Sequence, residues 1–205
     1  MSLFWLEPRP LVLASKSVIR ATVLRDAGLD PEILPSAVDE RVLEASLIPS
    51  EATPSGVAAA LALAKAVDVS NRAPGRLVVG CDQTLSLDGE RFTKPVDRNA
   101  GRSQLSRLSA RTHMLASGVA LARDGAALWT SVDEALLTMR SLSAEFTDRY
   151  LAAAGDGILA SVGGYQYEGL GAHLFARVEG DTRTILGLPL LPLLKALRDL
   201  GAVAS

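Results

Sequence analysis

Polar residues near the start of the chain could bind a phosphate group. Ser15, Lys16 and Ser17 directly follow the apolar run 11–14, and Arg20 lies one helical turn further on. A helix that begins here has free backbone N–H groups and the positive end of its dipole, which both favour a phosphate or a carboxylate. Arg20 could then bind phosphate oxygens through its guanidinium. A plain helix cap followed by a surface arginine explains the same pattern, so both interpretations stay open.

A carboxylate follows a second apolar run. The run 77–79 leads into Gly80, Cys81 and Asp82. Ligands of α/β sheets gather at the carboxyl ends of strands, where a carboxylate can bind a divalent metal ion or accept a proton from water. Asp82 is therefore a candidate catalytic residue, and an aspartate that starts a turn is the alternative. Cys81 is interpreted as a packing residue, because no histidine-containing triad pattern supports a thiol mechanism.

Other charged residues could complete such a site. Glu40 lies in a predicted acidic loop, 39–41, and together with Asp82 it could bind Mg²⁺. A solvated charged loop is the alternative. Lys65 and Lys94 could each place a positive charge beside a phosphate chain, although each could also be an ordinary surface lysine.

A glycine-dense stretch could approach a ligand closely. Glycine occupies four of the nine positions in 163–171, and glycine lets the backbone lie near a bound molecule. Glu168 could accept hydrogen bonds from a nucleotide base, and Tyr165 or Tyr167 could pack on its ring. A structural turn is the alternative.

The composition excludes several classes of protein. The chain has 205 residues, 48% of them hydrophobic, with a net charge of -2 and only 4% aromatic residues. Intrinsic disorder needs a more polar sequence, and no broad basic surface is available for nucleic acid or an anionic membrane. One cysteine cannot form an intrachain disulfide, which fits a cytoplasmic protein. The sequence has no P-loop, no GxGxxG after a strand and no zinc-ligand pattern around its two histidines.

The elements that must position these side chains alternate between short apolar runs and capped helices. Parallel crossovers and hairpin turns are both indicated, so we expect an α/β fold with a mixed central sheet and flanking helices, in one domain at 1–205. Strands are predicted at 11–14, 33–34, 77–79, 114–122 and 127–139, with a short one near the end of the chain. Helices are predicted at 17–27, from 54 onward, and at 97–108, 143–154 and 189–200.

Taken in order, these segments resemble the Maf (septum-formation inhibitor) family of nucleoside triphosphate pyrophosphatases over nearly the whole chain. The motifs that carry the resemblance are LVLASKSVIRATVLRDAGL at 11–29, Asp39-Glu40, LAKA at 63–66, GCDQ at 80–83, KP at 94–95, LS at 108–109 with His113, GYQYEG at 164–169 and ILGLPL at 185–190. Each motif is weak alone, but their joint order and spacing are specific.

The resemblance implies a two-lobed fold with a central cleft, related to inosine triphosphate pyrophosphatases. It implies hydrolysis of a nucleoside triphosphate between the α- and β-phosphates, giving the monophosphate and pyrophosphate. By position, Asp82 matches the catalytic aspartate, and Glu40 matches an acidic residue near the metal, Mg²⁺ or Mn²⁺. The residues that match phosphate-binding positions are Ser15, Arg20, Lys65 and Lys94. A homodimer is suggested as well, with no nucleic acid or membrane as a partner.

The finer resemblance is to family members that act on 7-methyl-GTP. Those members usually carry glutamine after the catalytic aspartate and glutamate in the glycine-rich loop, as Gln83 and Glu168 stand here. Ile19 departs from the pattern, because an arginine or tryptophan is usual at that base-recognition position, and Ala110 replaces a usual glycine. Two alternatives remain: a house-cleaning pyrophosphatase for non-standard nucleotides such as inosine triphosphate, and a nucleotide-binding regulatory protein without significant turnover.

Overall fold

One mixed sheet organises the part of the chain that the structure, a computed structural model, describes, residues 4–205. Its strands are β1 (Val12–Leu13), β2 (Glu32–Ile33), β3 (Val78–Leu87), β4 (Glu90–Phe92), β5 (Thr112–Arg123), β6 (Ala126–Met139) and β7 (Phe175–Glu179). They lie in the order β2-β1-β3-β5-β6-β7, and β4 pairs with β3. The pairs of β1 with β2 and β3 are parallel, and the other pairs are antiparallel. The predicted mixed α/β class is confirmed.

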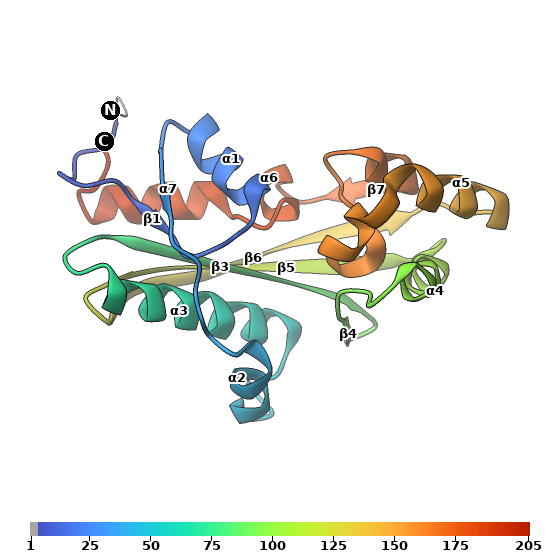
Figure 1. Cartoon of the computed structure of the whole chain (residues 1–205), viewed down its shortest axis with the longest axis horizontal. Helices are drawn as coiled ribbons and strands as arrows, with labels where there is room; N and C mark the ends of the chain where they lie inside the picture. Colours follow the sequence, from blue (N-terminus) through green and yellow to red (C-terminus); the bar gives the residue numbers. More distant parts are fainter. Residues whose placement is uncertain (1–3) are drawn as a thin grey trace.

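Helices cover both faces of the sheet (Figure 1). They are α1 (Val18–Asp26), α2 (Glu40–Ser46), α3 (Pro54–Arg72), α4 (Arg98–Leu108), α5 (Ala144–Ala154), α6 (Thr182–Ile185) and α7 (Leu190–Asp199). Short 3₁₀ helices are η1 (Gly155–Ala160), η2 (Val162–Gly164) and η3 (Leu170–Leu174). Among the described residues, no helix is long and apolar enough to cross a membrane.

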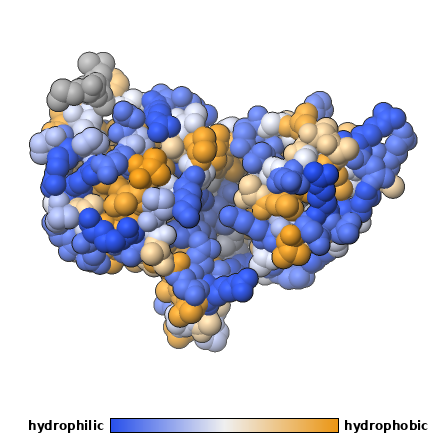
Figure 2. Space-filling model, viewed as in Figure 1, coloured by the Kyte–Doolittle hydropathy of each residue, from blue (hydrophilic) through white to orange (hydrophobic). Residues whose placement is uncertain are grey.

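The long strands β3, β5 and β6 extend through two lobes, each with its own core. The first lobe is built around β1, α1, α3 and α7, and its largest cluster packs α1 and α7 against the sheet. The second lobe is built around β4, α4, α5 and β7, with a separate cluster of buried side chains. Figure 2 shows the surface hollowed between the two lobes. The two-lobed shape with a central cleft is therefore as predicted.

Polar side chains cap four helices close to the predicted helix starts. Ser17 accepts a hydrogen bond from the N–H of residue 20, and Thr53 accepts one from residue 56 ahead of a proline at the first helical position. Asp97 and Ser143 cap α4 and α5 in the same way. These side chains satisfy N–H groups that have no partner inside the helix, so a local capping residue sets where each of these four helices begins.

Two tight turns close the antiparallel hairpins. Asp88 and Gly89 have φ values of 52° and 82°, and Asp124 and Gly125 have 51° and 79°. Positive φ at both central residues is the requirement of a type I′ turn, which matches the twist of the flanking strands. Ala110 also has a positive φ, 57°, in the left-handed region that favours glycine. The resemblance likewise leads one to expect glycine at this position.

Two predictions about local structure were wrong. Strand β3 does not end before Asp82 but continues to residue 87, because its polar residues have partners: Thr84, for example, donates a hydrogen bond to the Pro54 carbonyl 2.9 Å away. Residues 39–41 are not a loop, because Asp39 accepts hydrogen bonds from the N–H groups of residues 41 and 42 and begins α2. That helix has no buried residue, so no apolar periodicity revealed it.

Candidate active site

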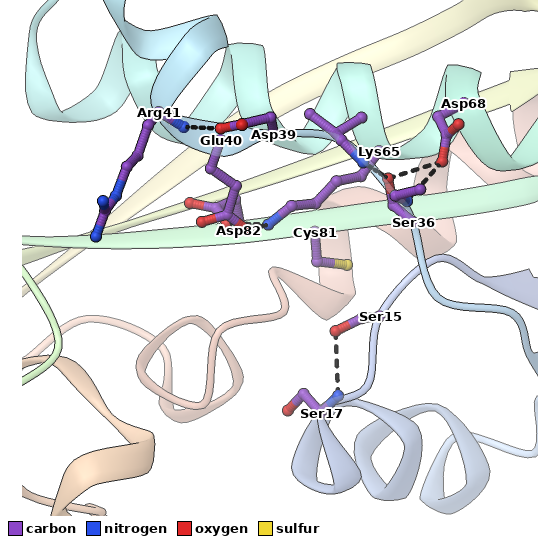
Figure 3. A network of polar contacts seen from close by, with 12 residues as sticks. Ser15, Ser17, Ser36, Asp39, Glu40, Arg41, Lys65, Asp68, Cys81 and Asp82 are labelled. Atoms are coloured by element: carbon purple, nitrogen blue, oxygen red, sulfur yellow. Dashed lines mark hydrogen bonds and ion pairs between the residues drawn. The ribbon is translucent and has the colours of Figure 1, made fainter.

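Three charged side chains from three elements meet at the sheet surface. Asp82 lies on β3, Lys65 on α3 and Glu40 at the first turn of α2. The Lys65 Nζ lies 2.6 Å from Asp82 Oδ1 and 2.5 Å from Glu40 Oε1 (Figure 3). The Lys65 and Asp82 side chains are each only 12% exposed, whereas Glu40 is 53% exposed. The site thus has a buried ion pair with a second carboxylate at its open side.

Close packing of α3 on the sheet sets the distance between Lys65 and Asp82. Gly80 on β3 and Gly118 on β5 face α3. If Gly80 carried a Cβ atom, that atom would lie 2.1 Å from the Ala62 carbonyl oxygen. A Cβ atom on Gly118 would lie 2.2 Å from another carbonyl oxygen of α3. Only glycine permits this approach, so the sequence of the strands places the helix that carries the lysine.

Burial and charge act in opposite directions on Asp82. Burial raises the pKa of its carboxyl group above the ordinary value, and the positive charges of Lys65 and Arg20 counter that increase. A carboxylate whose pKa is raised is a stronger base, and general-base catalysis is most effective when that pKa approaches the working pH. Burial also raises the pKa of Cys81 to about 11, so this thiol stays protonated near neutrality and its interpretation as a packing residue is supported.

Arg20 and Ser15 form a second polar group next to Asp82. Arg20 Nη1 donates to the Cys81 carbonyl at 2.9 Å and lies 3.3 Å from Ser15 Oγ. The Ser17 N–H donates to Ser15 Oγ at 3.2 Å, which orients that hydroxyl at the start of α1 (Figure 3). The predicted phosphate-binding turn therefore lies against the residue that precedes Asp82, and its donors suit an anion.

Gly187 supports Arg20 and was not among the predicted site residues. Arg20 Nε donates to the Gly187 carbonyl at 2.9 Å, across 167 positions of sequence. Gly187 has a φ of +85°, and a Cβ atom there would lie 3.1 Å from the guanidinium. The only signal for Gly187 in the sequence was the ILGLPL motif, which contributed to the family resemblance but did not indicate a contact with Arg20.

Gln83 is held by the protein itself. Its Nε2 lies 2.9 Å from Ser117 Oγ, 3.1 Å from the Thr184 carbonyl and 3.0 Å from the Ile185 carbonyl. An amide nitrogen has two hydrogens, so these acceptors use its donor capacity. Gln83 can therefore offer a ligand only its carbonyl oxygen.

The remaining predicted residues are not brought into contact with this cluster. Lys94 follows β4 and Glu168 lies between η2 and η3; both are exposed, and within residues 4–205 neither side chain has an ion pair or a hydrogen bond. Ile19 is half-buried in the first turn of α1. These three residues stay predictions.

The donor set near Asp82 could hold a divalent metal ion together with a substrate. In the described part of the chain, no group of three or more His, Cys, Asp or Glu side chains is arranged to hold a metal. Asp82 and Glu40 nevertheless converge on one cation, the Lys65 ammonium. Mg²⁺ is commonly bound by one or two carboxylates, with phosphate oxygens and water completing its shell. Two carboxylates fit that pattern.

Comparison with known proteins identifies the family. The model of the Maf-like protein family matches residues 10–200. A 7-methyl-GTP pyrophosphatase of Brucella abortus is 54% identical over 92% of this chain and 94% of its own length. A nucleoside triphosphate pyrophosphatase of Nitrobacter hamburgensis is 50% identical over 98% of both chains. Among solved structures, a HAM1 protein from Coxiella burnetii overlaps 63% of this chain and 72% of its own, at 14% identity and a TM-score of 0.42. The chain belongs to the Maf family.

Proposed function

We propose that this protein hydrolyses a nucleoside triphosphate between its α- and β-phosphates, with Asp82 as the catalytic carboxylate. The class of enzyme follows from its relatives: proteins at least 50% identical over more than nine-tenths of the chain are named as pyrophosphatases of nucleoside triphosphates, and this chain is a hydrolase of that class. The single observation that most supports the residue assignment is the buried Asp82, paired with Lys65 and adjoining the Arg20 contact.

Phosphate chemistry suggests a role for each group. A water oxygen forms a bond to phosphorus, the bond from that phosphorus to the bridging oxygen breaks, and the pyrophosphate leaves. Asp82 accepts the proton of the water, while Lys65 keeps the carboxylate ionised beforehand. Arg20, Ser15 and Lys94 bind phosphate oxygens and offset their charge. Mg²⁺ or Mn²⁺, held by Asp82 and Glu40, would supply Lewis-acid stabilisation of the phosphate charge.

The base-reading groups favour a guanine-type base. Gln83 can offer only its carbonyl oxygen, and Glu168 offers a carboxylate, so both are hydrogen-bond acceptors. Guanine presents N–H donors side by side on one edge, and a 7-methyl group lies on the other side of the purine and does not block those donors. Ile19 supplies an apolar contact in place of an aromatic face. We therefore propose 7-methyl-GTP or another modified purine nucleotide as the substrate.

The setting of the enzyme is part of the same proposal. We take 1–205 as a single Maf-like pyrophosphatase domain, although its first three residues lie outside the described part of the chain. A homodimer in the cytoplasm, without nucleic-acid or membrane partners, is proposed from the family resemblance.

Replacement of Asp82 tests the function. Asp82→Asn keeps the shape of the side chain but removes its negative charge and most of its basicity, so pyrophosphate release from 7-methyl-GTP should fall by about 10²–10³-fold, as with other losses of a preorganised catalytic group. A coupled pyrophosphate assay measures the rate, and circular dichroism checks that the variant folds.

Asp199→Asn is the matched control, because Asp199 forms an exposed ion pair with Lys195 at the same 2.6 Å distance. Wild-type turnover in Asp82→Asn would remove Asp82 from the mechanism. If the wild-type protein were stabilised by nucleotides against heat yet released no pyrophosphate from any of them, the regulatory alternative would replace the enzymatic one.

A further inference from the structure

The position of α2 is not explained by apolar packing. No residue of α2 is buried, yet its first residue, Glu40, lies 2.5 Å from the Lys65 ammonium. A helix of one or two turns without a buried side chain relies on other contacts for its position, such as the 2.7 Å ion pair between Glu44 of α2 and Arg91 of β4. That pair acts toward the end of α2, so the place of Glu40, at the start of α2, depends also on polar contacts of the segment that precedes the helix.

Asp68 supplies such contacts directly upstream of α2. Its Oδ2 accepts hydrogen bonds from Ser36 Oγ at 2.9 Å and from the Ala37 N–H at 3.0 Å (Figure 3). Ser36 Oγ in turn accepts a hydrogen bond from the N–H of Val38 at 3.1 Å. The segment 36–38 is thus attached to α3 immediately before Asp39 begins α2.

Arg72 reinforces the attachment. Its Nη2 lies 2.9 Å both from Asp68 Oδ2 and from the Pro35 carbonyl oxygen. Burial on its own would raise the pKa of Asp68, but the hydrogen bonds from Ala37, Arg72 and Ser36 outweigh it and lower the pKa below the ordinary value. Asp68 is therefore ionised near neutrality and can accept all three hydrogen bonds at once.

Lys65 and Asp68 stand three residues apart on α3, which puts them on the same face of the helix. One holds Glu40 and the other holds the segment that leads to Glu40. We propose that Asp68 is a positioning residue, which fixes the 36–38 segment so that Glu40 lies against Lys65 and Asp82 at the start of the reaction. The inference rests on the role of Glu40 in the proposed function.

A double-mutant cycle in the full-length protein tests this role. Asp68→Ala frees the segment, so kcat for pyrophosphate release should fall by about 10- to 100-fold, the usual cost of a misplaced catalytic group. Glu40→Gln should lower kcat as well. If Asp68 acts through Glu40, adding Asp68→Ala to Glu40→Gln should lower kcat by less than about twofold further, since residues that share one function are not additive.

Two further variants separate positioning from general stability. Asp68→Asn keeps an oxygen that can accept from Ser36 and Ala37, so it should restore most of the lost kcat. Glu145→Ala removes another carboxylate that pairs with an arginine four residues on, Arg149, and should leave kcat unchanged.

Three results would overturn the positioning role. The first is wild-type kcat in Asp68→Ala. The second is an equal loss of kcat when Asp68→Ala is added to the wild type and to Glu40→Gln, which would leave the role of Glu40 intact. The third is a Glu40→Gln variant with wild-type kcat, which would also remove Glu40 from the proposed function, whereas the Asp82→Asn assay tests the hydrolysis itself independently.

Discussion

Burial controls the charge of His113, a residue inside the second lobe. The side chain is 1% exposed on β5, and its Nε2 lies 2.7 Å from the Tyr165 hydroxyl. Its Nδ1 has no hydrogen-bond partner among the described residues. Burial lowers the pKa of His113 to about 4, so the ring is neutral near pH 7. The histidine thus links the sheet to the glycine-rich stretch that carries Glu168.

This environment predicts a specific acid sensitivity. In the unfolded chain a histidine gains a proton near pH 6.5, whereas in the folded protein His113 gains it only near pH 4. The unfolded state therefore binds more protons between these values, and the stability contribution present above pH 6.5 is lost as the pH falls toward 4. Urea unfolding across this window should show a loss of at most about 3 kcal/mol from this residue.

His113→Gln should flatten the dependence of the free energy of unfolding on pH between 6.5 and 4, because glutamine can hydrogen-bond to Tyr165 without titrating. The chain has two histidines, and the exposed His173 provides the control, since His173→Gln should leave the slope of the wild type. An unchanged slope in His113→Gln would show that other groups cause the acid sensitivity.

The chemical types of the site residues were easier to predict than the contacts that hold those side chains in place. Ser15, Arg20, Lys65 and Asp82 are of types that suit phosphate chemistry, and their place after apolar runs or in family motifs indicated them before any contact was known. The supports depend on contacts between distant positions. Gly187 reaches Arg20 across 167 positions, and local sequence patterns carry no information about such contacts.

At the scale of elements, the close contact between α3 and the sheet should affect both stability and activity. Gly118 pairs with Asp82 across β5 and β3, and a Cβ atom at Gly118 would meet the Ala58 carbonyl oxygen at 2.2 Å. Gly118→Ala should therefore push α3 outward, lower the free energy of unfolding by about 1–3 kcal/mol, and reduce activity by moving Lys65 away from Asp82. Urea unfolding and pyrophosphate release measure the two effects.

Gly157→Ala is the control for this substitution. A Cβ atom at Gly157 would lie 3.6 Å from Gln166 Oε1, an ordinary van der Waals contact, so both properties should stay close to wild type. If Gly118→Ala were equally neutral, α3 would have room to move without loss, and the glycine contact would not set the position of Lys65.

The elements that the sequence predicted are those with strong local signals. Capped helices and type I′ turns depend on residues within a few positions of each other, so their bounds were found to within a few residues. The helix α2 and the full length of β3 were missed. The first has no apolar face, and the second contains polar residues that find partners in other elements, such as Thr84 with Pro54.

At the scale of the whole molecule, the proposed nucleotide contacts come from both lobes. Arg20 and Ile19 lie on α1 of the first lobe, whereas Lys94 follows β4 and Glu168 lies between η2 and η3 in the second lobe. The long strands β3, β5 and β6 join the lobes into one sheet. Because Glu168 and Arg20 lie in different lobes, we expect base recognition by Glu168 to be separable by mutation from phosphate binding by Arg20.

Glu168→Ala should impair base recognition and leave phosphate binding unchanged. Loss of a charged hydrogen-bond acceptor costs roughly 1.5–3 kcal/mol, so kcat/KM for 7-methyl-GTP should fall about 10- to 100-fold. Inhibition by pyrophosphate, which carries no base, should be as strong as in the wild type. In the control variant Glu145→Ala, which removes an exposed carboxylate of α5, both kcat/KM and pyrophosphate inhibition should stay at wild-type values. A nucleotide panel should also show reduced preference for guanine-type bases. Weaker pyrophosphate inhibition in Glu168→Ala would place Glu168 with the phosphates, and an unchanged kcat/KM would exclude it from recognition of the base.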